Sequence, residues 1–450
     1  MYLSCCWDRC STDNHKWPLR NLIVNVGPLR LRRPFCAMLA LMAALACAPL
    51  ALAADYSLLG FGTLAYAVSD QKAAYLRYID KQGTFKADSL IGLQGEVQFN
   101  PQWGATIQVV GSAPRSRDGG LEATIRWAFL SYRPSNDWLI RAGRIRPSVL
   151  VNMQNAEAGM TYDTLRLPAE VYSLSPVYDL DGLAFSRVWN QGTSETSIEG
   201  YAGSSQVAFR TPFLRNPENG ALQNQYVPQR VGFAGMTLTH QGSRFALKGG
   251  IHKATVTPDQ QQLVESFDPV QLPGPFPIGG TLFVPGRPIR KFDVTVVTLG
   301  AEIRQSGWKV LTEYGHRVVK DTNLAIGSKS AYVSVIRDAD TWSPYVAYAR
   351  ILSESVTRDL YRRIDAAPVP IGAQLPPLSL AAAYHHGLAD NITVFDQYSW
   401  MIGTSWRMSS NSKLKFELMR TKVGLASALV DGDVHHKSFN VLSMSYNFVF

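Results

Sequence analysis

The last fourteen residues, KSFNVLSMSYNFVF (Lys437–Phe450), decide the fold that we expect for this chain. Counted back from the end, large apolar residues stand at every second position: Phe450, Phe448, Tyr446, Met444 and Leu442. Because successive side chains of a strand point to opposite faces, this period predicts a strand with one apolar and one polar face. A transmembrane barrel requires such strands, since lipid lies outside and water inside. An edge strand of a soluble β-sandwich is the alternative.

One long apolar run lies near the start of the chain, at residues 35–54. Arginines precede it and an Ala-Leu-Ala segment ends it, which is the arrangement of a secretory signal. We therefore expect residues 30–53 to be a signal peptide cleaved near Ala53/Ala54, with a membrane anchor as the alternative. We interpret residues 1–29 as the product of a start codon placed too far upstream. Residues 54–450 then form one domain, which has no further run long enough for a membrane helix.

Removal of the leader changes the composition. All five cysteines lie within it: Cys5, Cys6, Cys10, Cys36 and Cys47. The expected mature chain therefore has no disulfide, thiolate metal site or cysteine nucleophile. The full chain has a net charge of +9, and residues 1–53 hold six Lys/Arg and two Asp/Glu, so +5 remains. This weakly positive net charge gives no indication of nucleic-acid binding, which needs a clustered basic face.

Tryptophan flanks six short polar turns. Four tryptophans follow a turn directly and two precede one: Trp103, Trp138, Trp308 and Trp342, then Trp189 and Trp406. Tight turns with tryptophan beside them predict an aromatic girdle at one membrane interface. In several strands, including residues 414–418, charged residues alternate with apolar ones. That alternation favours a water-filled lumen over a packed sandwich core.

Short and long connections alternate along the chain. Seven short turns are expected near residues 100–102, 134–137, 190–193, 240–243, 305–307, 338–341 and 409–412. Eight longer connections are expected near 70–87, 113–121, 147–181, 204–228, 255–290, 319–328, 353–393 and 422–436. Fifteen connections predict an all-β, antiparallel transmembrane barrel of about sixteen strands, with both termini on the periplasmic side. We place Leu378–His386 inside the seventh loop, although a partner strand beside it would give eighteen.

Together these features resemble the Gram-negative outer-membrane porin superfamily. The resemblance is carried by the leader, the first strand around Gly60-Phe61-Gly62, the tryptophan-flanked turns and the terminal Phe450, and it covers residues 54–450. It implies that Phe450, with Phe448 and Tyr446, is read by the barrel assembly machinery. It also implies a homotrimer in the cell outer membrane, among outer-membrane lipids and lipopolysaccharide, that passes small hydrophilic solutes.

The resemblance further implies that the third long connection folds into the barrel and narrows the pore. This connection, Pro147–Asp181, carries Glu157, Asp163, Glu170, Asp179 and Asp181, and nearby basic residues are Arg126, Arg141, Arg144 and Arg146. We expect the constriction to be lined by these four arginines together with Glu157, Asp163, Asp179 and Asp181. Opposed charges there would produce a transverse field that favours polar solutes. Ordinary rim charges are the alternative.

The direction of each arginine depends on strand alternation. Arg126 is expected to face inward if Ile125, Trp127 and Phe129 face lipid. Lipid-facing Trp138 would send Arg141 inward and Arg144 outward. The Gly143-Arg144 pair, however, resembles the porin Gly-Arg whose arginine lines the pore. A β-bulge would reconcile the two readings, and the sequence leaves both open.

No residue pattern indicates catalysis, a metal site or a cofactor. No segment matches the lipid-facing His and Ser of barrel phospholipases, and the His385-His386 and His435-His436 pairs fall in expected loops. We therefore expect a non-enzymatic, passive channel with a slight anion preference. The basic set Arg358, Arg362 and Arg363 in the seventh loop would bind lipopolysaccharide phosphates, attract anions or simply be solvated. A barrel enzyme acting on lipids and a structural or adhesive barrel with a closed lumen are the alternative functions.

Overall fold

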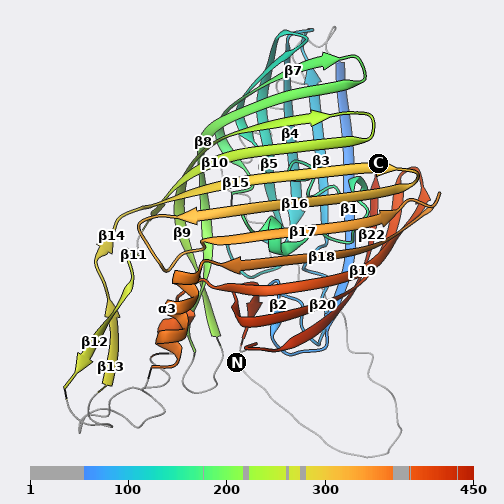
Figure 1. Cartoon of the computed structure of the whole chain (residues 1–450). Helices are drawn as coiled ribbons and strands as arrows, with labels where there is room; N and C mark the ends of the chain where they lie inside the picture. Colours follow the sequence, from blue (N-terminus) through green and yellow to red (C-terminus); the bar gives the residue numbers. More distant parts are fainter. Residues whose placement is uncertain are drawn as a thin grey trace, which may run out of the picture. The chain divides into compact units, whose positions relative to one another are not determined.

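A computed structural model describes residues 55–175, 177–215, 222–259, 263–273, 280–367, 385, 387–432 and 434–450. The chain divides into two units, Met1–Cys47 and Ala48–Phe450, and the described residues belong to the second. Sixteen of its strands close into one antiparallel barrel (Figure 1), which confirms the predicted fold and strand number.

The barrel strands follow one another around the wall in chain order. They are β1 (Asp55–Ser69), β3 (Leu90–Gln98), β4 (Trp103–Ser112), β5 (Glu122–Ser135), β6 (Trp138–Ile145), β7 (Leu180–Gln191), β8 (Ser194–Arg215), β9 (Leu222–Gln241), β10 (Phe245–Pro258), β15 (Phe292–Gln305), β16 (Trp308–Val319), β17 (Ser328–Arg337), β18 (Trp342–Ser353), β19 (Phe395–Ser409), β20 (Ser412–Ser427) and β22 (Ser438–Val449). Short turns join them at one end, and longer connections join them at the other. We call these ends the short-turn end and the long-connection end.

The last strand closes the barrel against the first. Phe448 lies opposite Gly62 in the β1–β22 register, and Phe450 exchanges two backbone hydrogen bonds with Gly60, of 2.7 and 2.9 Å. A Cβ atom at Gly60 would lie 2.2 Å from the Phe450 ring, and one at Gly62 would lie 2.5 Å from the Phe448 ring. Glycine is therefore required at both positions, because the aromatic rings occupy the space above them.

Alternation separates an apolar outer face from an inner face. On β17, Val333 and Val335 are exposed, while Tyr332 and Ser334 between them are buried. On β20, Phe416 and Leu418 are exposed, and Lys415 and Glu417 point inward and are buried. An apolar outside with charged groups inside is the arrangement of a lipid-spanning barrel. Among the described helices, none is long and apolar enough to cross a membrane.

Several long connections contain structure of their own. Their described residues contain six short strands: β2 (Ala74–Tyr75), β11 (Leu263–Val264), β12 (Phe267–Leu272), β13 (Gly280–Pro285), β14 (Pro288–Ile289) and β21 (Val430–Asp431). The seventh connection contains helix α3 (Ser355–Asp365). The expected fourth loop, 204–228, is wrong in its bounds, because β8 and β9 continue pairing to Arg215 and Leu222. Apart from His385, the segment Leu378–His386 lies outside the described residues, so its predicted place in the seventh loop stays a prediction.

The third long connection, residues 146–179, folds into the barrel as predicted. It contains a short 3₁₀ turn, η2 (Gly159–Thr161), and a single helical turn, α2 (Ala169–Tyr172), which packs against β16, β17 and β18. We call its described residues, 146–175 and 177–179, the inner loop.

Candidate functional site

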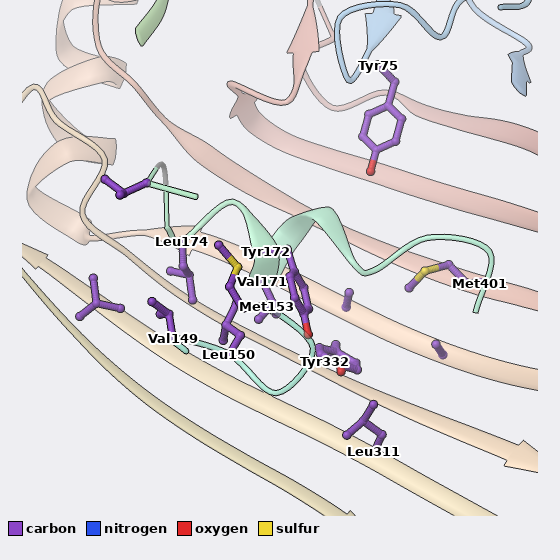
Figure 2. Packing of buried hydrophobic residues seen from close by; sticks show 14 of the residues in the cluster. Tyr75, Val149, Leu150, Met153, Val171, Tyr172, Leu174, Leu311, Tyr332 and Met401 are labelled. Atoms are coloured by element: carbon purple, nitrogen blue, oxygen red, sulfur yellow. The ribbon is translucent and has the colours of Figure 1, made fainter. Parts of the chain in front are cut away.

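The inner loop is held to the barrel wall by an apolar core. Its buried members include Val149, Leu150, Met153, Val171 and Leu174, and Figure 2 shows them beside side chains from the wall strands: Leu311, Tyr332 and Met401. Full burial of such an aliphatic side chain contributes about 1.5–3 kcal/mol. Small inward residues of β17 and β18 leave room for the loop: Ser330, Ser334, Ala347 and Ala349. The loop therefore packs as an interior layer of the barrel.

Leu174 illustrates how closely loop and wall approach. A Cβ atom at Gly315 of β16 would lie 2.0 Å from Leu174 Cδ1. Two residues further along β16, the guanidinium of Arg317 donates hydrogen bonds to the carbonyl oxygens of Ser173 and Leu174, each of 2.9 Å. These contacts close the end of α2 against the wall.

Five charged residues meet where the inner loop leaves and re-enters the wall. We call this group the arginine cluster: Arg115, Arg126, Arg146, Glu157 and Asp179. Arg146 Nη2 lies 2.8 Å from Glu157 Oε2 and 3.0 Å from Asp179 Oδ1. Arg126 Nε lies 3.0 Å, and Arg115 Nη2 3.1 Å, from Glu157 Oε1. The cluster holds three guanidinium groups and two carboxylates, so one positive charge is in excess.

The two carboxyl groups of the arginine cluster respond differently to their surroundings. Burial alone would raise the pKa of Glu157, but the charges of Arg146, Arg115 and Arg126 outweigh it and lower that pKa to about 2. For Asp179 burial dominates over the same guanidinium groups, and its pKa is raised. Glu157 is therefore the more firmly ionised of the two.

A second charged group lies near the short-turn end. Asp163 of the inner loop sits between Lys309, with which it is paired, and Lys413, whose Nζ lies 3.1 Å from Asp163 Oδ1. Burial would raise the pKa of Asp163, but the two lysines lower it to about 2. Each lysine is the second residue of its strand after a short turn, so the inner loop reaches from one end of the barrel almost to the other.

Further polar contacts fix the middle of the inner loop. Lys415 Nζ donates to the carbonyl oxygens of Gly159 and Thr164, at 2.7 and 2.9 Å. Arg166 pairs with Asp88 at 2.8 Å. The Glu313 carboxylate accepts hydrogen bonds from the Tyr172 hydroxyl (2.7 Å), the Tyr332 hydroxyl (2.8 Å) and the backbone N–H of Val151 (2.7 Å). Glu170, another acid of this loop, accepts hydrogen bonds from Gln397 (2.8 Å) and Ser399.

The structure brings Arg126 to the interior by a route that the sequence did not predict. The β4–β5 register shifts between Gln108, which pairs with Trp127, and Val109, which pairs with Ile125, so Arg126 is the extra residue of a β-bulge in β5. Phe129 packs against the interior core, so the expectation that it faces lipid is wrong. A bulge adds a residue to one strand and re-aims its side chains, and it turns Arg126 inward beside Glu157.

Arg141 and Arg144 lie on different faces of β6. Arg141 pairs with Glu199 at 3.0 Å, and both side chains are mostly buried. Arg144 pairs with Asp181 at 2.8 Å, on the same face of β7 as the exposed Leu183. The structure therefore leaves Arg144 and Asp181 out of the interior group, which corrects the expectation for those two residues.

The aromatic residues singled out from the sequence lie on the outer face. The rings of Tyr446, Phe448 and Phe450 stack in succession, with centroids 5.7 and 6.1 Å apart. The six tryptophans lie beside short turns. Trp342 and Trp406 stack at 5.3 Å, Trp103 packs on Tyr132, and arginine side chains lie over Trp138, Trp189 and Trp308.

The sequence did not single out Lys309, Lys413, Glu313 and Arg166 as interior residues. The alternation in residues 414–418 does predict an inward Lys415, which the structure confirms. A signal for Lys309 was present, because it stands between the apolar residues Trp308 and Val310 of its strand, whereas Lys413 follows the polar Ser412. Their partners in the inner loop had no such signal. Within the described residues, no group of three or more His, Cys, Asp or Glu side chains is arranged to hold a metal ion.

Comparison with known proteins gives similarity in structure only. No protein-family model and no curated protein matches the sequence. The chain is similar to a loop L8 deletion mutant of OmpT, an outer membrane protein of Vibrio cholerae (11% identity, 88% of this chain and 100% of that chain, TM-score 0.49). It is also similar to the outer membrane channel DcaP of Acinetobacter baumannii (13% identity, 88% of this chain and 97% of that chain, TM-score 0.49). A third similar structure is an anion-selective porin from Comamonas acidovorans (11% identity, 88% of this chain and 100% of that chain, TM-score 0.46). The closure and strand order of the barrel establish its fold independently of these likenesses.

Proposed function

We propose that this protein is an outer-membrane porin, a passive channel for small hydrophilic solutes. The observation that carries the proposal is the inner loop, which lies inside a closed sixteen-stranded barrel and holds charged groups near both ends of it. Sixteen strands enclose more space than wall side chains fill, so an aqueous path remains beside such a loop. A loop that serves only to close the lumen would not need ionised groups at both ends.

The mechanism has no covalent step. A solute exchanges part of its hydration shell for polar groups of the constriction, and the constriction selects by size and charge. The arginine cluster has three cations and two anions, and Lys309 and Lys413 share one anion, Asp163. Each group keeps one positive charge in excess, which supports the slight anion preference.

As a porin, the barrel would be assembled in the outer membrane with a fixed orientation. The long-connection end faces outward from the cell, and the six tryptophans mark the periplasmic interface of the membrane. Phe450, Phe448 and Tyr446 present the assembly signal, and the barrel forms a homotrimer among outer-membrane lipids and lipopolysaccharide. The stacked rings of Tyr446, Phe448 and Phe450 on the outer face of the closing strand support the role as assembly signal.

Planar-bilayer recording on the purified protein tests the channel. We expect steady ion current, with a reversal potential in a KCl gradient that indicates slight anion selectivity. Absence of current would contradict the proposal and favour a barrel with a closed lumen. Release of fatty acid from outer-membrane phospholipid by the same preparation would favour a lipid-acting enzyme.

A further inference from the structure

The β8–β9 hairpin stands opposite the connection between β20 and β22. In the closed strand order, six strands separate the two in either direction around the wall. A contact between them must therefore span the long-connection mouth of the barrel.

The β8–β9 hairpin is long enough to reach across. The pairing of β8 with β7 ends at Ser204, and the pairing of β9 with β10 ends at Gln229. Beyond these points, residues 205–215 and 222–228 pair only with each other, and Figure 1 shows both strands running on past their neighbours. At roughly 3.3 Å per residue, Arg210 lies about 20 Å along the strand from Ser204. We call this extension the strap.

Arg210 joins the strap to the opposite connection. Its guanidinium forms a two-pronged ion pair with the carboxylate of Asp431, with an Nη2–Oδ2 distance of 2.5 Å. Asp431 belongs to β21, which pairs with β2 of the first long connection. Bidentate guanidinium–carboxylate pairs are the strongest and most directional ion pairs between side chains.

Asp118 of the second long connection adds a second attachment. The Tyr226 hydroxyl donates to Asp118 Oδ1 at 2.8 Å, and Arg210 Nη2 lies 3.5 Å from Asp118 Oδ2. Arg77 of the first connection donates to the same carboxylate at 3.1 Å. We call Arg210, Asp431, Asp118, Tyr226 and Arg77 the latch. It ties the strap to three long connections.

We propose that the strap is a second size filter across the external mouth, held closed by the latch; this rests on the proposed channel function. Small ions pass beside a two-stranded ribbon, whereas a larger sugar needs the ribbon to move. The latch residues are partly exposed, with side-chain exposures of 17% for Arg210 and 21% for Asp431. A partly exposed ion pair contributes modestly to stability even when it is bidentate, so loss of the Arg210–Asp431 pair raises the open fraction by about fivefold.

The test uses Arg210→Cys with Asp431→Cys. All native cysteines lie at or before residue 47, so a chain cleaved at the expected site has no other thiol. Liposome swelling compares permeation of a monosaccharide and a trisaccharide. We expect the double variant to pass the trisaccharide faster than the wild type, by up to about fivefold. A short bis-maleimide that joins the two thiols should reverse the gain.

Controls separate the strap from other effects. Arg210→Cys alone, treated with the same reagent, should stay fast, and Arg230→Gln, an exposed arginine of β9 outside the latch, should behave as wild type. Asp431→Asn, which keeps the shape of the side chain, should also speed the trisaccharide. If the trisaccharide rate changes with neither substitution nor cross-linking, the proposed size filter is overturned, but the proposed channel function is not. A wild type that passes neither ions nor sugars would overturn the proposed function with it.

Discussion

The inner loop and the strap both cross the barrel, but they are held in different ways. The inner loop buries a row of aliphatic side chains and ion pairs such as Arg146–Glu157, whose side chains are 1% and 9% exposed. The strap crosses the mouth on partly exposed ion pairs: Arg210 is 17% exposed, Asp431 21% and Asp118 44%. Burial makes each inner contact costly to lose, whereas solvent and salt compete for the outer ones. We therefore expect a fixed inner constriction and a movable outer one.

Leu174→Ala should have the largest effect on the inner loop. Removing a buried leucine side chain costs about 2–5 kcal/mol. Hydrogen exchange followed by mass spectrometry should show faster exchange across residues 146–179, because the docked state is less stable. Val335→Ala, on the lipid-facing side of β17, is the matched control and should leave exchange in the loop unchanged. Equal hydrogen exchange of the inner loop in both variants would contradict the account that buried apolar side chains hold the loop to the wall.

Arg146→Gln should have the next largest effect. It leaves Glu157 with Arg115 and Arg126, but it removes the closest partner of Asp179. The expected loss is about 1–3 kcal/mol in the docking of the loop, with channel selectivity moving toward cations. Reversal potentials and hydrogen exchange measure both changes. Arg144→Gln, on the outer face, should alter neither.

Salt should distinguish the strap from the inner loop. Raising KCl from low concentration to 1 M shortens the screening length to about 3 Å and weakens exposed ion pairs first. Trisaccharide permeation should rise with salt in the wild type and change less in Asp431→Asn, whose latch is already weakened. A parallel rise in both proteins would argue against an electrostatic latch.

Acid should produce the smallest changes, in a definite order. Among the inner-loop carboxyls Asp179, Glu157 and Asp163, only Asp179 has a raised pKa, so it loses its charge before the other two as pH falls, and anion preference should rise because a negative charge disappears. The pKa values of Glu157 and Asp163 are lowered to about 2. Their contribution to stability is thus present above their ordinary pKa values and is lost only as pH falls toward about 2. In reversal-potential titrations, Asp179→Asn should reduce the rise in anion preference on acidification, and an unchanged rise would contradict the role assigned to Asp179.

Much of the barrel could be predicted from local sequence patterns. The period of two in Lys437–Phe450 predicted the closing strand, and the alternation of short and long connections predicted sixteen strands. Both signals are local, because side-chain direction and turn length depend on neighbouring residues.

The site was less predictable, since it depends on contacts between distant residues. A register shift at Arg126 itself reverses the simple inside–outside count of β5 and is not visible in residue types. The partners of Asp163 are Lys309 and Lys413, which lie 146 and 250 residues further along the sequence. The extension of β8 and β9 was read as a loop because its sequence, 204–228, lacks clear alternation.

In the proposed channel, charges inside the barrel determine what passes through it. Reversal potentials of Arg126→Glu combined with Arg141→Glu test it most directly, with Arg144→Glu as the control on the outer face. The inner double variant should become cation-selective, and the control should keep the wild-type value. Equal reversal potentials in all three proteins would contradict the claim.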